Sequence, residues 1–143
     1  MRQQELAPRL GRAAEHVVAA WLLRNNDVWV SAMPDAASVD LVVVPRARPD
    51  KRYSIQVKMV FDAKSKAGQH RTVNVSKASG IRYNPSEVDF LVAVDIESLT
   101  FWMIPVRALK NLGRVRLGKK YSGYALGWHD TCPVFGMRSE RAK

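Results

Sequence analysis

The apolar stretch YSIQVKMV, residues 53–60, is interrupted by two polar residues that sit two positions apart. On a β-strand Gln56 and Lys58 point to the same face, while their apolar neighbours point to the other. Asp40 enters a second apolar run, VDLVVV, where an unpaired carboxylate is costly without a cation. Glu15 adds a further carboxylate from the edge of the apolar stripe of an expected helix.

These four side chains offer two carboxylates, one amide oxygen and one ammonium group. Adjacent strands of a hairpin bring Asp40 within reach of Gln56 and Lys58. Three oxygen ligands suit a hard divalent cation such as Mg²⁺ or Mn²⁺, which polarises a phosphoryl oxygen and activates a bound water. Lys58 can orient that water or stabilise the charge developing on the phosphate. The residues together predict phosphodiester hydrolysis.

Each of these residues has a simpler interpretation. Gln56 and Lys58 also fit an edge strand with a solvated polar face, and Glu15 fits a solvated helix carboxylate paired with a nearby arginine. Two other aspartates follow prolines, but Asp35 lies in a turn-like stretch before the strand and Asp50 in the polar turn after it. Among the three aspartates only Asp40 enters an apolar strand, so it is the expected site residue.

The elements that must position these residues form an α/β pattern. A helix is expected from Pro8, which can occupy a first turn, to a cap at Asn25 and Asn26. Short strands follow, expected at 28–33, 39–44, 53–60, 72–77, 90–96 and 100–106. Two hairpins are expected, one joining the second strand to the third and one joining the last two. The remaining segments are a mobile polar loop at 61–70, one or two helical turns at 106–112, and a tail from Gly113 that shows no placeable pattern.

Three motifs in this order, Gly11-x-x-x-Glu15, Val39-Asp40 and Gln56-Val57-Lys58, resemble the PD-(D/E)XK nuclease superfamily. Within it the pattern is similar to archaeal Holliday-junction resolvases and to group I intron homing endonucleases that use Gln-x-Lys. The stretches VDFLVAV and FWMIP also resemble a strand pair of the small endonuclease-like families in this group. The resemblance covers roughly residues 10–107.

The resemblance implies a restriction-endonuclease-like fold, with a mixed central β-sheet flanked by helices, and Mg²⁺-dependent cleavage of DNA, often by a homo-oligomer. It makes Asp40 and Gln56 metal ligands, with the carbonyl of Val57 as a possible third and Glu15 completing the site. Lys58 becomes the catalytic lysine. Gln56 departs from the family, which usually has a carboxylate there, so the site loses a negative charge and should hold metal more weakly.

The chain is strongly basic: 23 Lys and Arg face 13 Asp and Glu, for a formal charge of +10. Such a charge fits a polyanionic partner, most simply nucleic acid, although an anionic membrane or simple solubility also fits. Two stretches, 64–82 and 107–121, carry basic residues and no acid. The expected DNA contacts in and around them are Lys64, Lys66, His70, Arg71, Lys77, Arg82, Arg114, Arg116, Lys119 and Lys120.

Chain length and cysteine use bound the remaining possibilities. The 143 residues suggest one nuclease domain, 1–143, with a core at about 10–107 and a basic extension at 108–143. The single cysteine, Cys132, is expected to be structural, and it suits a reducing cytoplasm. The charged N-terminus shows no secretory signal, and no apolar run approaches the ~18 residues of a membrane span.

The sequence therefore predicts a metal-dependent DNA endonuclease. Two alternatives stay open: a DNA-binding module on the same fold that has lost cleavage, and a basic structural or RNA-associated protein without a site. The DNA form also stays open, whether a junction, a specific duplex site, or damaged or single-stranded DNA. A homodimer or a higher oligomer is expected because cutting both strands needs two sites.

Overall fold

The computed structural model describes residues 3–34, 37–66, 68–76, 83–109 and 113–135. The larger sheet is built from β1 (Val28–Ala32), β2 (Leu41–Pro45), β3 (Tyr53–Met59), β6 (Phe90–Asp95), β7 (Thr100–Pro105) and β9 (Ala125–Gly127). A smaller sheet is built from β4 (Phe61–Ser65), β5 (Gly68–Asn74) and β8 (Arg114–Arg116). The helical elements are α1 (Gln3–Asn25), α2 (Val106–Leu109) and two short 3₁₀ segments, η1 (Lys119–Tyr124) and η2 (Pro133–Phe135).

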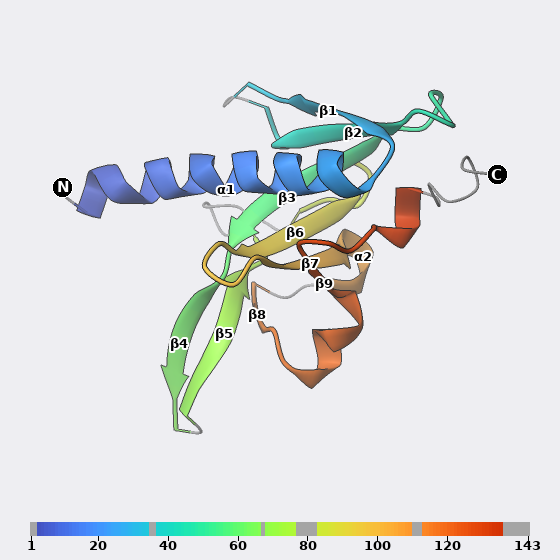
Figure 1. The fold of residues 1–143 in the computed structure, drawn as a ribbon. Helices are drawn as coiled ribbons and strands as arrows, with labels where there is room; N and C mark the ends of the chain where they lie inside the picture. Colours follow the sequence, from blue (N-terminus) through green and yellow to red (C-terminus); the bar gives the residue numbers. More distant parts are fainter. Residues whose placement is uncertain (1–2, 35–36, 67, 77–82, 110–112, 136–143) are drawn as a thin grey trace.

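The larger sheet has six strands in the order β1-β2-β3-β6-β7-β9. The β3–β6 pair is parallel, and the other pairs are antiparallel. The sheet is therefore mixed, and the predicted α/β class is confirmed, as are both predicted hairpins. The three strands β4-β5-β8 form an antiparallel sheet that extends away from the larger one (Figure 1).

Two hydrophobic clusters cover the two faces of the larger sheet. On one face lies α1 (Figure 1), whose Val18 and Trp21 share a buried cluster with Ile55 and Val57 of β3. On the other face, Leu91 of β6 and residues of β7 pack against the smaller sheet. Because side chains alternate along a strand, β3 directs Ile55 and Val57 toward α1 and Gln56 and Lys58 toward the opposite face.

The helix is longer than predicted. It begins at Gln3, so Pro8 lies inside it rather than in its first turn. The preceding residues favour helix strongly enough to continue it through the proline, at the loss of one backbone donor. The predicted end at Asn25 is confirmed, and the amide of Asn26 donates a hydrogen bond to the Leu22 carbonyl at 3.0 Å. Across the described part of the chain, no helix combines the length and the apolar character that a membrane span requires.

The prediction of a polar loop at 61–70 was wrong. These residues form β4 and the start of β5, which pair from Phe61 with Thr72 to Ser65 with Gly68. The third strand of this sheet, β8, comes from the part of the sequence that showed no pattern, and it pairs Val115 with Val73. Because the partner strand is distant in sequence, local patterning could not reveal the sheet.

Trp21 joins the helix to the sheet at the centre of the first cluster. Its side chain is fully buried, its ring stacks on Phe101 at 4.2 Å between centroids, and its indole N–H donates to the Gly127 carbonyl at 3.0 Å. Replacing Trp21 with alanine is expected to lower the free energy of unfolding by about 3–5 kcal/mol. Urea denaturation followed by circular dichroism measures this loss. Leu10→Ala, at an exposed leucine of the same helix, is the control and should cost far less.

Trp128 and Cys132 contact the C-terminal end of α1. Asn25 donates to the Trp128 carbonyl at 2.6 Å, and the Cys132 N–H donates to the Asn26 side chain at 2.9 Å. Cys132 is fully buried, and burial raises the pKa of its thiol to about 12. The thiol is therefore protonated at neutral pH, which agrees with the structural role expected for it.

Candidate functional site

Asp40 directly precedes β2, at the point where the pairing of β2 with β3 ends and one edge of β3 is left without a partner strand among the described residues. The β2–β3 register runs from Val43 opposite Tyr53 to Leu41 opposite Ile55 and then stops. The Asp40 backbone N–H donates to the Ile55 carbonyl at 3.0 Å, and its side-chain Oδ2 accepts the Val57 N–H at 2.8 Å. The carboxylate thus sits at the edge of β3, just beyond the last residue paired with β2.

The backbone carbonyl of Val57 faces the same side as the Asp40 carboxylate. In a strand, the N–H and the C=O of one residue point to the same edge. Since the Val57 N–H reaches Asp40, its carbonyl also points toward that open edge. Gln56 comes directly before it and is half-buried on the face opposite α1. The Val57 carbonyl therefore accompanies Asp40 at this edge, and the Gln56 side chain leaves the strand on the face opposite α1.

Lys58 follows on the same face as Gln56 and is half-buried. Burial lowers the pKa of its ammonium group below the ordinary 10.5, and the negative charge of Asp40 acts in the opposite direction. Its Nζ lies 5.7 Å from the ring centroid of Tyr83. A desolvated ammonium group beside a carboxylate is suited to stabilising further negative charge brought to the site.

Tyr83 is the site residue that the sequence did not predict. Only 7% of its surface is exposed, and burial, with a smaller contribution from Asp40, raises the pKa of its hydroxyl to about 12. It stays neutral at physiological pH and presents its ring to Lys58. The only sequence signal was a lone aromatic residue before the turn at Asn84 and Pro85, which does not distinguish it from an ordinary core tyrosine.

Glu15 lies on the α1 side of the sheet, whereas Gln56 and Lys58 point to the other side. It is half-buried and lines a groove of about 210 Å³ with Met33 and Leu41, the neighbours of Asp40 in the ladder and in the chain. The structure therefore joins Asp40 to Val57 by a hydrogen bond and places the Asp40 charge near Lys58. Glu15 lies on the α1 side of the sheet, beside Met33 and Leu41.

The donor groups at the open edge fit a hard divalent cation in kind, because all of them are oxygens. Their charge is low, since Asp40 supplies one carboxylate beside Val57, and a second carboxylate joined to β3, that of Asp89, instead accepts the Ser54 N–H at 2.8 Å near the start of the strand. Within the residues that the structure describes, no group of three or more His, Cys, Asp or Glu side chains could hold a metal ion. A metal would thus depend on the Gln56 amide and the Val57 carbonyl, so weak binding is expected.

The smaller sheet brings together the two basic stretches of the sequence. Pairing of β5 with β8 places Thr72 opposite Arg116 and Asn74 opposite Arg114. The Arg114 guanidinium lies 5.2 Å from the Phe61 ring centroid, and its Nε donates to the Asn74 side chain at 3.3 Å. A groove of about 230 Å³ opens on this sheet, and its polar lining consists of Lys64, His70, Thr72, Arg114 and Arg116.

We call this surface, with the adjoining Lys119 and Lys120, the basic groove; Arg114 and Arg116 line both the groove and the hollow that holds the two lysines. Lys66 is exposed at the turn between β4 and β5. Lys77 and Arg82, two further predicted DNA contacts, lie outside the described residues.

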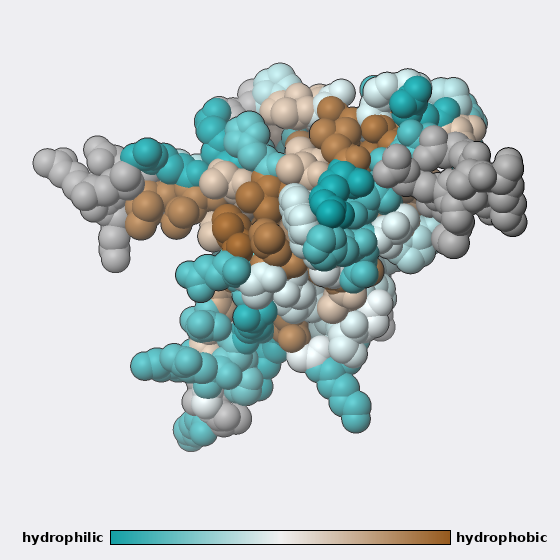
Figure 2. Space-filling view, viewed as in Figure 1, coloured by the Kyte–Doolittle hydropathy of each residue, from teal (hydrophilic) through white to brown (hydrophobic). Residues whose placement is uncertain are grey.

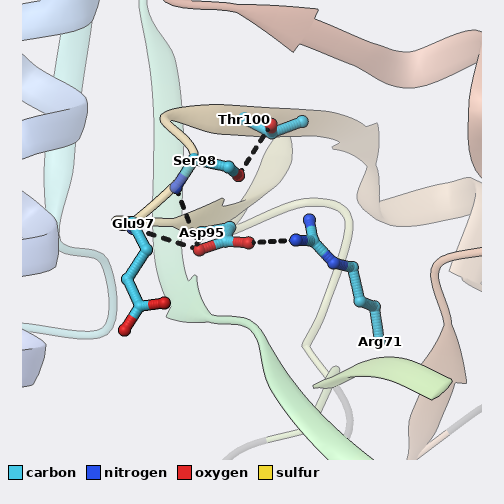
Figure 3. A network of polar contacts seen from close by, with 5 residues as sticks. All are labelled: Arg71, Asp95, Glu97, Ser98 and Thr100. Atoms are coloured by element: carbon cyan, nitrogen blue, oxygen red, sulfur yellow. Dashed lines mark hydrogen bonds and ion pairs between the residues drawn. The ribbon is translucent and has the colours of Figure 1, made fainter. Parts of the chain in front are cut away.

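Arg71 is separated from the basic groove. Its guanidinium binds the Asp95 carboxylate at 2.7 Å, and the same carboxylate accepts the backbone N–H groups of Glu97 and Ser98 (Figure 3). Asp95 ends β6, so this contact fastens the smaller sheet to the turn between β6 and β7. In this structure Arg71 therefore connects the two sheets.

The fold is a mixed α/β arrangement similar to that of a homing endonuclease. One similar solved structure is that of the bacterial homing endonuclease I-Ssp6803I, with a TM-score of 0.65 and 21% sequence identity over 85% of this chain and 89% of that one. No protein-family model matches the chain. No curated protein matches it in sequence either.

Proposed function

We propose that the chain is a metal-dependent DNA endonuclease of the PD-(D/E)XK type that hydrolyses phosphodiester bonds, with Mg²⁺ as cofactor and Mn²⁺ as a substitute. The observation that carries this proposal is the Asp40 carboxylate at the open edge of β3, bonded to Val57 and electrostatically coupled to Lys58. The likeness of the fold to a homing endonuclease supports it.

Each residue has a role in the proposed reaction. Asp40, the Gln56 amide oxygen and the Val57 carbonyl would hold the metal, and Glu15 would extend that site from α1. When bound, the metal would polarise the phosphate and activate a water. Lys58 orients the attacking water or stabilises the charge that develops on the phosphate. The ring of Tyr83, beside the ammonium group, limits where that group can point.

A panel of DNA substrates tests the proposal: a four-way junction, a flap, supercoiled plasmid and linear duplex, each with Mg²⁺, Mn²⁺ or EDTA. Cleavage of at least one form, abolished by EDTA, is the expected result. If every form stays intact under all conditions, the nuclease proposal fails. If one form is cleaved, the same panel identifies the DNA form that the protein cuts.

A DNA-binding module without cleavage is the second candidate, favoured by the amide at Gln56 and by the low charge of the site. Calorimetry separates the two candidates, because the proposed metal-dependent nuclease must bind a divalent cation in the wild type. DNA binding without detectable metal binding would support the module.

The basic groove is expected to bind the DNA backbone. The double variant Arg114→Ala, Arg116→Ala should weaken binding to every DNA sequence about equally and reduce the slope of log K against log salt by about two. Fluorescence anisotropy at several salt concentrations measures both. Lys51→Ala, Arg52→Ala, at exposed residues of the β2–β3 turn, is the matched control. Equal slopes in the two double variants would exclude the groove as a phosphate contact.

A further inference from the structure

The strand β1 forms one outer edge of the six-stranded sheet, and it pairs with β2. Among the described residues, no strand pairs with its other edge. Its sequence, VWVSA, contains no charged residue and no proline, so two features that commonly protect an edge strand from pairing are missing. The edge is therefore chemically suited to accept another strand.

Two backbone hydrogen bonds show which residues face that edge. The Met33 N–H donates to the Asp40 carbonyl at 2.9 Å, and the Arg46 N–H donates to the Asp27 carbonyl at 3.0 Å, one at each end of the β1–β2 ladder. In an antiparallel ladder, hydrogen-bonded residues alternate with residues that face away. The residues whose N–H and C=O point to the open edge are therefore Val28, Val30 and Ala32.

Apolar side chains flank this edge on both faces. On the α1 face, Leu23 is 52% exposed and lines a groove with Val30 and Ala32. On the opposite face, Trp29 is 51% exposed. Leu23 and Trp29 are two of the four large hydrophobic residues exposed in the described part of the chain. Figure 2 shows hydrophobic surface along α1 and over part of the β1–β2 region, in contrast to the hydrophilic hairpin of β4 and β5.

We propose that this edge pairs with β1 of a second copy of the chain, antiparallel and about a two-fold axis at Val30. The outward residues are symmetric about that axis, so Val30 faces its own copy and Val28 faces Ala32 of the partner. The ion pair nearest the strand joins Asp27 and Arg46 at 3.7 Å, and the Arg46 guanidinium lies 5.4 Å from the ring centroid of Trp29, on the face opposite α1. No two like charges of the strands meet, and the edge is complementary to itself.

The pairing has a consequence for the site, and this consequence rests on the proposed nuclease function. A two-fold axis perpendicular to the joined sheet keeps both copies of Lys58 on the same face. The two β3 strands are separated by five strand spacings, about 24 Å. One duplex lying across that face can then reach both sites, one for each DNA strand.

Sedimentation equilibrium of the whole chain over the micromolar range tests the interface. The wild type should be a dimer, and Leu23→Lys and Ala32→Pro should each raise its dissociation constant at least about tenfold. The proline removes an outward N–H without removing a bond to β2, since Ala32 faces away from it. Leu10→Lys, at an exposed leucine of the same helix, is the matched control and should leave the dimer unchanged. Circular dichroism checks that each variant is folded.

A monomeric wild type, or a dimer that both Leu23→Lys and a folded Ala32→Pro leave intact, overturns the interface. If Ala32→Pro does not fold, the dissociation constants of Leu23→Lys and Leu10→Lys are compared instead, and equal values overturn the interface. Cleavage is assayed separately, so a dimer of the expected kind that cuts no DNA retains the interface and rejects the nuclease. Full double-strand cleavage by a monomeric variant rejects the paired arrangement and retains the nuclease.

Discussion

Replacing Lys58 with methionine is expected to reduce metal-dependent DNA cleavage by at least about 10²–10³-fold. Methionine keeps most of the length and apolar volume of the stem, but it removes the charge that stabilises the attack. DNA affinity should change little, because the basic groove lies on the smaller sheet. Single-turnover cleavage of the substrate identified by the panel, beside anisotropy, measures both quantities.

The stability of Lys58→Met relative to the wild type is also expected to depend on pH. Burial lowers the pKa of Lys58 in the folded chain, so the unfolded chain binds more protons between that lowered pKa and 10.5. Wild-type stability therefore rises with pH across this window. Lys58→Met should be more stable than the wild type at neutral pH, and this gain should shrink as the pH rises. Urea denaturation at several pH values measures it.

Lys51→Met is the matched control, because Lys51 is an exposed lysine of the turn between β2 and β3, outside the basic groove, at which no stability gain is expected. If Lys58→Met cleaves DNA at the wild-type rate, Lys58 has no part in the reaction and the site assignment fails. A stability gain with unchanged cleavage would mark Lys58 as a buried charge of purely structural consequence.

Replacing Asp40 with asparagine is expected to reduce cleavage by about 10²-fold or more and to remove detectable binding of Mg²⁺ or Mn²⁺. The asparagine oxygen can still accept the Val57 N–H that Asp40 accepts at 2.8 Å, so the fold should persist. What disappears is the negative charge, the main attraction for a cation at the edge of β3. Isothermal titration calorimetry and the cleavage assay test the two effects.

Asp50→Asn, at an exposed aspartate of the turn between β2 and β3, is the control and should change neither property. The basic structural or RNA-associated alternative makes the opposite prediction for Asp40→Asn: no loss of function and, at most, greater stability from removing a costly charge. Loss of metal-dependent cleavage in the variant excludes that alternative.

The parts of the fold that the sequence predicted are those with local apolar periodicity. The stripe containing Val18 and Trp21 identified α1, and β-branched runs identified β2, β3, β6 and β7. Hairpins with short turns were also accessible, because their two strands are neighbours in sequence. The hairpin of β4 and β5 was missed because its residues are mostly polar and its third strand comes from β8.

The candidate site, too, could be predicted from the sequence only in part. Asp40, Gln56 and Lys58 were identifiable because polar residues in apolar strands are costly without a reason. That β2 stops opposite Ile55, leaving the Val57 N–H to the Asp40 carboxylate, depends on strand register. Tyr83 enters from a loop, and its contact with Lys58 follows from how that loop packs on the sheet.

The sequence by itself therefore determined which residues could do chemistry, the elements that carry them and the sign of the surface charge. Only the tertiary structure decided how these parts meet. It joined two basic stretches into one groove, engaged Arg71 with Asp95, and left β1 as an open edge. The physical reason is that periodicity and charge are local properties of a chain, whereas pairing between distant strands is fixed by burial of both faces of the sheet at once.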